Sequence, residues 1–172
     1  MAATITVLAG ALLLAAPSAN AARPIRTEEP PGEFFIPAGE GCPDFGVHGE
    51  GIHHTRIVHT QFSDGREVTN TSATIALTNV ETHQTVEQLS RYMSVTTVDP
   101  DAGDLLVEIH GRFFVAFWPG DIGPDGSTIV TESMLLSVVG HQTFTLDAET
   151  GAFVDYELDG QVVFDVCAAL SG

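Results

Sequence analysis

The chain has 172 residues, with 23 Asp or Glu against six basic residues, all of them Arg, and its formal net charge at pH 7 is −17. A surface that binds nucleic acid or anionic lipid needs a basic stripe, and this composition speaks against one. The charge also favours a soluble monomer. We therefore expect neither nucleic acid nor membrane as a partner, but a small molecule or another extracellular protein.

Residues 1–21 are typical of a secretory signal peptide. The apolar run over residues 5–16 is too short to span a bilayer, and Ala19-Asn20-Ala21 matches the small-residue cleavage pattern. The segment before the run carries no Lys or Arg, which departs from the usual signal. We expect a mature protein that is secreted, extracellular and free of the membrane after cleavage.

Residues 22–41 are rich in Pro, Gly and Glu, which predicts a flexible leader. Residues 42–172 have the size of a single domain. Cys42 and Cys167 lie near the two ends of that domain, and export permits them to form a disulfide. Such a closure stabilises by about 4–5 kcal/mol in the chain-entropy model. Two buried free thiols are the alternative.

Alternation of apolar and polar residues predicts strands through this domain, and no stretch keeps a helical period. The clearest strand is 105–117, where Val107, Ile109 and Phe113 share one face and Glu108 and His110 share the other. Residues 128–139 are apolar on both faces, which suggests a bulge or burial on both sides. We expect about eight strands, near 54–62, 67–70, 72–79, 86–98, 105–117, 127–139, 141–147 and 152–165.

The turns predict how these strands connect. Asp64-Gly65 and Asp159-Gly160 are candidates for two-residue hairpin turns, so the last strand is expected to split at Asp159-Gly160. Sequential hairpins make neighbouring strands antiparallel. The predicted fold is all-β, an antiparallel up-and-down barrel of about eight strands closed by the disulfide between its ends, with a two-sheet β-sandwich as the alternative.

Several short stretches also resemble a group of small exported β-barrel proteins of high-GC Gram-positive bacteria. The resemblance covers most of the mature chain and supports the predicted fold. It implies no activity and no site residue, because the shared motifs are turn and core signatures. These stretches are Cys42-Pro-Asp-Phe, Leu77-Thr-Asn-Val-Glu-Thr, His110-Gly-Arg-Phe-Phe, Leu146-Asp-Ala-Glu-Thr-Gly and Phe164-Asp-Val-Cys-Ala-Ala-Leu.

Two groups of polar residues are candidates for chemistry. His48, His53, His54 and His59 lie close together in the sequence, but their spacing matches no metal motif, so we expect solvated histidines, no metal and no cofactor. Glu108, His110 and Arg112 share one face of the clearest strand. If that face lined a cavity, this row would hold an anionic or polar ligand; the alternative is an outer, solvated face.

No nucleophile elbow or phosphate-binding glycine loop occurs in the sequence. We therefore expect a non-enzymatic protein that binds a small hydrophobic ligand or presents an interaction surface. The alternative is an enzyme on the same scaffold, like the barrel isomerases and cyclases that take a hydrophobic substrate into the lumen, which is fold-level analogy. The orientation of the Glu108, His110 and Arg112 row distinguishes the two hypotheses.

Overall fold

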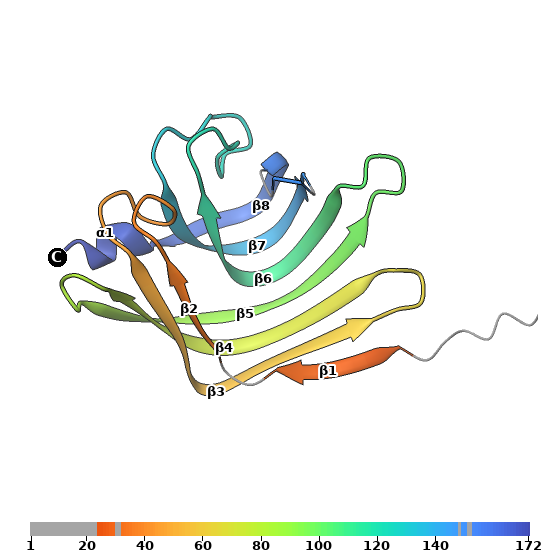
Figure 1. Ribbon diagram of the computed structural model, residues 1–172, viewed down its shortest axis with the longest axis horizontal. Coiled ribbons are helices and arrows are strands. Elements are labelled where there is room, and N and C mark those ends of the chain that lie inside the picture. The colour runs from red at the N-terminus through yellow and green to blue at the C-terminus, as the bar shows by residue number, and fades with distance from the viewer. Residues whose placement is uncertain (1–23, 30–31, 148, 151–152) are drawn as a thin grey trace, which may run out of the picture.

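A computed structural model describes residues 24–29, 32–147, 149–150 and 153–172, so the predicted signal peptide lies outside the described residues (Figure 1). The described part is almost entirely β-structure and ends in one short helix. Its elements are β1 (Ile25–Glu29), β2 (Glu33–Ile36), β3 (Val47–Gln61), β4 (Glu67–Asn79), β5 (Thr85–Val98), β6 (Leu105–Phe117), β7 (Met134–Leu146), β8 (Phe153–Asp165) and α1 (Val166–Leu170). Among these residues no helix has the length and apolar character that crossing a bilayer requires.

All eight strands belong to one antiparallel sheet, which confirms the all-β prediction. Strands β3 to β8 follow one another as a meander, each paired with the next. The sheet is strongly curved, and its long strands bend in the same direction (Figure 1). Two short strands, β1 and β2, both pair with β3 along its free edge.

The predicted closed barrel is not confirmed. Within the described residues β8 pairs with β7 alone, and no ladder joins β8 to β1, β2 or β3. The reason lies on the edge of β3, because β1 and β2 already take the backbone groups that a closing strand would need. These two strands come from the segment expected to be a flexible leader. Mobility of the rest of that segment stays a prediction.

A row of three glycines crosses the sheet where the strands bend. Gly111, Gly140 and Gly160 are register neighbours on β6, β7 and β8. The first two have φ of +124° and +142°, and a Cβ at any of the three would collide with the backbone of a neighbouring strand. The hairpin predicted at Asp159-Gly160 is therefore wrong. That glycine lies inside β8 because it permits close strand approach, which is the other use of a glycine in a strand.

One core cluster lies on the face of the sheet formed by the last three long strands. The cluster contains a group of aromatic rings with centroids 5.1–6.2 Å apart, most of them meeting edge to face or tilted, whereas the Phe144 and Tyr156 rings are stacked; Phe117 and the half-buried Phe153 complete the group. We call this side of the sheet the core face. The cluster consists of Ile109, Val115, Phe117, Val130, Leu136, Val138, Phe144 and Tyr156.

A second core cluster joins the two ends of the domain. The β5–β6 ladder stops at Arg91 and Arg112, although β6 runs on to Phe117, and α1 packs against β4, β5 and β7. Leu135 belongs to this cluster whereas its neighbour Leu136 belongs to the first, which confirms the predicted burial of β7 on both faces. The cluster consists of Cys42, Phe45, Val47, Leu77, Leu135, Val166 and Leu170.

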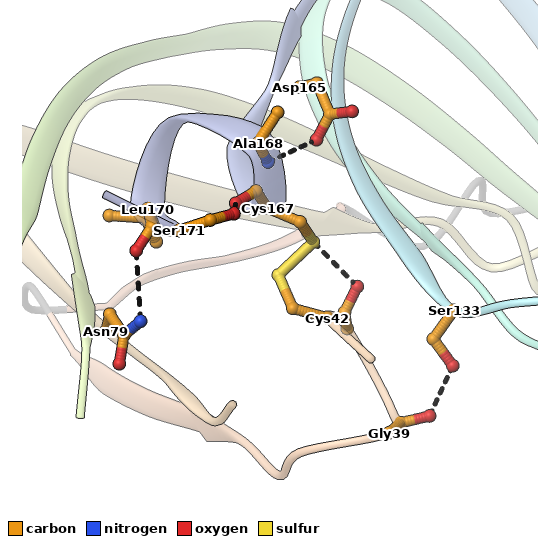
Figure 2. Close-up of a disulfide and its surroundings, with 10 residues drawn as sticks. Gly39, Cys42, Asn79, Ser133, Asp165, Cys167, Ala168, Leu170 and Ser171 are labelled. Atoms are coloured by element: carbon orange, nitrogen blue, oxygen red, sulfur yellow. Dashed lines mark hydrogen bonds between the residues drawn. A yellow bond between two sulfur atoms is a disulfide. The ribbon is translucent and has the colours of Figure 1, made fainter. Parts of the chain in front are cut away.

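The predicted disulfide is confirmed and anchors this second cluster (Figure 2). Cys42 and Cys167 are bonded at 2.04 Å across a sequence separation of 125. The side-chain carboxylate of Asp165 caps α1 by accepting from the Ala168 amide at 3.0 Å. At the other end of α1 the buried Asn79 amide donates to the Leu170 carbonyl at 3.0 Å. Both termini of this short helix are thus satisfied by side chains.

Candidate functional site

The predicted row of Glu108, His110 and Arg112 lies on the face opposite the core face. The side chains of Glu108 and His110 are about half exposed, whereas Ile109 between them is 2% exposed and belongs to the core. The row therefore does not line an interior cavity. The outer-face alternative describes it correctly, because the strand alternates strictly between the two faces.

His141 joins this row, although the sequence analysis did not single it out for this site. It lies on β7 directly opposite His110, and the two rings stack with centroids 4.3 Å apart and an interplanar angle of 7°. Each His Nε2 lies about 3 Å from the same Glu108 Oε1, at 2.9 Å from His110 and 3.0 Å from His141. The hydrogen bond with His110, followed by that with His141, lowers the pKa of Glu108.

Glu108, His110 and His141 are also of the types that zinc and copper bind. Their ligand atoms lie within 4.8 Å of one another, and among the described residues no other such group of three occurs. The hydrogen bonds between them already occupy one ligand atom of each group. The candidate metal ligands considered from the sequence were instead the histidines of residues 48–59.

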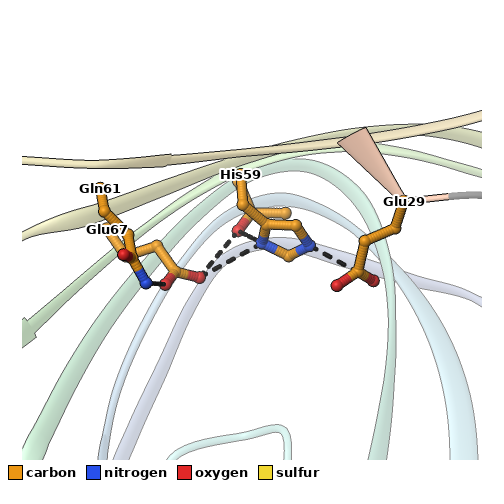
Figure 3. A network of polar contacts seen from close by, with 5 residues as sticks. Glu29, His59, Gln61 and Glu67 are labelled. Atoms are coloured by element: carbon orange, nitrogen blue, oxygen red, sulfur yellow. Dashed lines mark hydrogen bonds and ion pairs between the residues drawn. The ribbon is translucent and has the colours of Figure 1, made fainter. Parts of the chain in front are cut away.

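Two of those histidines, His48 and His59, contact carboxylates of neighbouring strands at separate places along β3. His59 on β3 lies 3.3 Å from a Glu67 oxygen on β4 and 3.6 Å from a Glu29 oxygen on β1, and Thr69 Oγ1 is 2.9 Å away (Figure 3). His48, at the other end of β3, lies 3.4 Å from Glu33 on β2. The two histidines thus attach the two short strands to the same edge.

The pKa of Glu67, one of the carboxyl groups around His59, is lowered. A hydrogen bond from the Gln61 amide, at 3.3 Å, is the main reason that the pKa of Glu67 is lowered. Burial opposes this effect, and His59 adds to it. The network around His59 lies between β1, β3 and β4, and its contacts connect these three strands.

Four of the five described arginines lie on the face opposite the core face, which we call the arginine face. Arg56, Arg91 and Arg112 belong to one register row across the sheet, in which Ser72 separates the first two. Arg26 on β1 joins the same face through its pairing with Thr60. Arg56 lies 3.3 Å from Glu28, whereas the other three have no carboxylate within 4.0 Å among the described residues.

A groove of about 660 Å³ opens on the arginine face. It crosses five strands, and both polar and apolar atoms line it. Three of the four arginines contribute to its wall together with one histidine, the asparagine of β4 and a methionine. These residues are Arg26, Arg56, Arg91, His110, Asn70 and Met93.

A smaller, predominantly apolar pocket of about 260 Å³ lies on the core face, between β2 and the middle of β3, β4, β5 and β6. The aromatic rings of Tyr92 and Phe113 meet edge to face there, with centroids 5.0 Å apart. Glu33 is the carboxylate among its lining residues. Its main apolar lining consists of Phe34, Ile57, Ile75, Tyr92, Phe113 and Phe114.

One hydroxyl group distinguishes this pocket from an ordinary packing defect. Thr71 is 8% exposed, and its Oγ1 has no hydrogen-bond partner among the described residues. Thr71 shares its strand parity with Ala73 and Ile75, which also line the pocket, so its side chain faces the cavity. A buried hydroxyl without a partner costs free energy, and a bound polar group would recover it. This pocket depends on how β2 folds back along β3, which strand alternation does not predict.

Comparisons of the chain with protein-family models, with curated proteins and with solved structures return no match.

Proposed function

We propose that this protein binds a small hydrophobic molecule that carries one hydrogen-bonding group, and that the apolar pocket on the core face is the binding site. The unpartnered Thr71 hydroxyl in a predominantly apolar wall is the observation that carries this proposal. Small-molecule sites combine an apolar lining with a few polar groups that fix the orientation of the ligand.

The pocket volume limits the size of the ligand. A cavity of about 150 Å³ accommodates benzene, and sites for drug-sized molecules begin at about 300 Å³. At about 260 Å³ the pocket suits a compact bicyclic molecule or a short branched chain. Phe34 belongs to the short strand β2, so one wall is formed by a segment that pairs only with β3.

The residues around the pocket favour a protein that binds this molecule and does not convert it. Acid–base catalysis needs a titratable group positioned at the ligand, and the Glu33 carboxylate in the pocket lining already contacts His48. The row of Glu108, His110 and Arg112, which would have favoured an isomerase or cyclase, lies on the opposite face. The disulfide supports a secreted protein that works in an oxidising compartment, and the net charge of −17 supports a monomer.

A neutral fluorescent probe tests the site. N-phenyl-1-naphthylamine fluoresces in apolar surroundings, and we expect one saturable site per chain. Ala73→Leu fills the pocket and is expected to weaken binding at least tenfold. Ala76→Leu makes the same change on the opposite face of the same strand and should stay within twofold of the unmodified protein. Equal binding by both variants, or no saturable binding, would contradict the proposal.

The polar specificity is tested separately with 2-naphthol and naphthalene. The unmodified protein should prefer 2-naphthol by about fivefold or more, because one net hydrogen bond is worth about 1 kcal/mol. Thr71→Val keeps the volume and removes the hydroxyl, so the preference should disappear. A preference that survives this substitution would place the polar contact elsewhere.

A further inference from the structure

We propose a second binding site, on the arginine face, for a small molecule that carries two or more anionic groups. The site is the groove that Arg26, Arg56 and Arg91 line, and Arg112 is the register partner of Arg91 on the neighbouring strand. It lies on the opposite side of the sheet from the apolar pocket and does not depend on the function proposed for that pocket.

The first argument is an electrostatic conflict inside the sheet. Arg91 and Arg112 are direct register partners on β5 and β6, and side chains in such positions start only about 5 Å apart. Like charges directly opposite each other destabilise a sheet. No described carboxylate lies within 4.0 Å of either guanidinium, so the protein itself does not relieve the repulsion. An anion between them would.

The second argument is the distribution of charge over the chain. Acidic residues outnumber arginines 23 to six, so an arginine with no carboxylate nearby is unexpected. Nevertheless Arg26, Arg91 and Arg112 have none within 4.0 Å among the described residues, and all three lie on one face. The remaining described arginine, Arg66, lies in the β3–β4 hairpin, where it pairs with Asp64 at 3.9 Å and covers the Phe62 ring.

The third argument is the chemistry of the donors. Guanidinium groups bind phosphate and carboxylate in a planar, two-pronged geometry, which suits neighbouring arginines better than a single point charge. The His110 ring and the Asn70 amide add hydrogen-bond donors to the same groove. Arg56 lies two strands away from Arg91, or about 10 Å at the usual strand spacing. That span fits two anionic groups in one ligand.

Calorimetric titration of the full chain with pyrophosphate, at low ionic strength and pH 7, tests the site. We expect one saturable site that weakens as salt is added. Arg91→Gln should weaken binding at least tenfold. Arg66→Gln removes the same charge from the hairpin outside the groove and should stay within twofold. Equal weakening by both variants would show a general charge effect and overturn the proposal, as would the lack of saturable binding at millimolar pyrophosphate.

A second ligand identifies the anionic group. Tricarballylate carries three carboxylates and no phosphate, so tighter binding of either compound assigns the ligand class and supports the site. Arg112→Gln and Arg56→Gln provide further tests, with melting temperatures to confirm that each variant folds. If Arg112 and Arg56 can both be replaced in folded protein without a change in affinity for either ligand, the register row is not the site.

Discussion

The two core clusters of this protein are built in different ways. The first is formed by three consecutive strands, β6, β7 and β8, and by Val130 in the loop between two of them. The second brings together Cys42, Phe45 and Val47 from the start of the domain with Val166 and Leu170 from its end. Contacts between near neighbours in sequence lose little chain entropy when they form, and contacts between the ends lose more. The disulfide is placed where that loss is largest.

Removal of the disulfide is expected to have the largest effect on stability. Replacing Cys42 and Cys167 together with Ser should lower the free energy of unfolding by about 5 kcal/mol in the chain-entropy model for a loop of this length. Denaturant unfolding of the variant against the oxidised parent measures the difference. A loss of less than about 1 kcal/mol would mean that the second cluster forms without support from the disulfide.

Truncation of one residue in each cluster sharpens the comparison. Phe117→Ala should cost about 3–5 kcal/mol and Leu170→Ala about 2–5 kcal/mol in the oxidised protein, since both side chains are fully buried. In the protein without the disulfide, Leu170→Ala should cost less, because its surroundings are already loosened, whereas Phe117→Ala should be additive. If only Phe117→Ala were non-additive, the disulfide would support the first cluster and not the second.

The glycine row gives the next largest expected effect. Gly140→Ala should destabilise by about 2 kcal/mol or more, since its φ of +142° is unfavourable for alanine and the new Cβ would meet the Asp159 carbonyl. Gly120→Ala is the matched control, because its φ is also positive, at +104°, but nothing lies within 4 Å of a Cβ there. Thermal unfolding of both variants separates the collision from the backbone strain. Equal losses would show that close strand approach does not matter.

Substitution of Tyr156 is expected to change stability least, but the pKa of its hydroxyl can be measured directly. Its hydroxyl donates to Gln142 Oε1 at 3.1 Å, and burial raises the pKa of Tyr156 to about 12. The raised pKa means that its contribution to stability is complete below the unfolded value of about 10 and is lost as the pH rises through about 12. Tyr156→Phe should cost about 1–3 kcal/mol at neutral pH.

Ultraviolet titration of tyrosinate measures this pKa directly. The protein has two tyrosines, so the Tyr156→Phe variant identifies the transition that belongs to Tyr156. A transition near 10 that disappears in that variant would show that the hydroxyl is in contact with water.

Much of the fold could be predicted because strand alternation is a local property. Strand β6 has the predicted bounds of 105–117, and β5 begins one residue before its prediction. Glycine is ambiguous, because it serves equally in a turn and at a close approach between strands. The sequence could not tell which role Gly140 and Gly160 have, so β7 and β8 were each divided where the structure continues.

The candidate sites depended on register, which the sequence does not contain. Glu108 and His110 were correctly placed on one face because they are two residues apart on one strand. Arg56, Arg91 and Arg112 come from three strands, and only the pairing of those strands aligns them. For the same reason the composition suggested that no basic stripe exists, although four scattered arginines lie on one face. His141 and the Thr71 pocket were missed for this reason too.

The cross-link between Cys42 and Cys167 also determines how the molecule would respond to mechanical tension. A force applied to the two ends of the chain would pass through the sulfur–sulfur bond and bypass the strands between them. The strands from β3 to β8 would then carry no load, whereas β1 and β2 lie outside the bridge and would be pulled from the edge of β3. In the reduced protein the same force would act on β3 and α1 and peel the sheet from both of its edges. The oxidised bridge would therefore protect β3 to β8 under tension, whereas Phe34 in the wall of the pocket and Arg26 in the wall of the groove would be pulled away first.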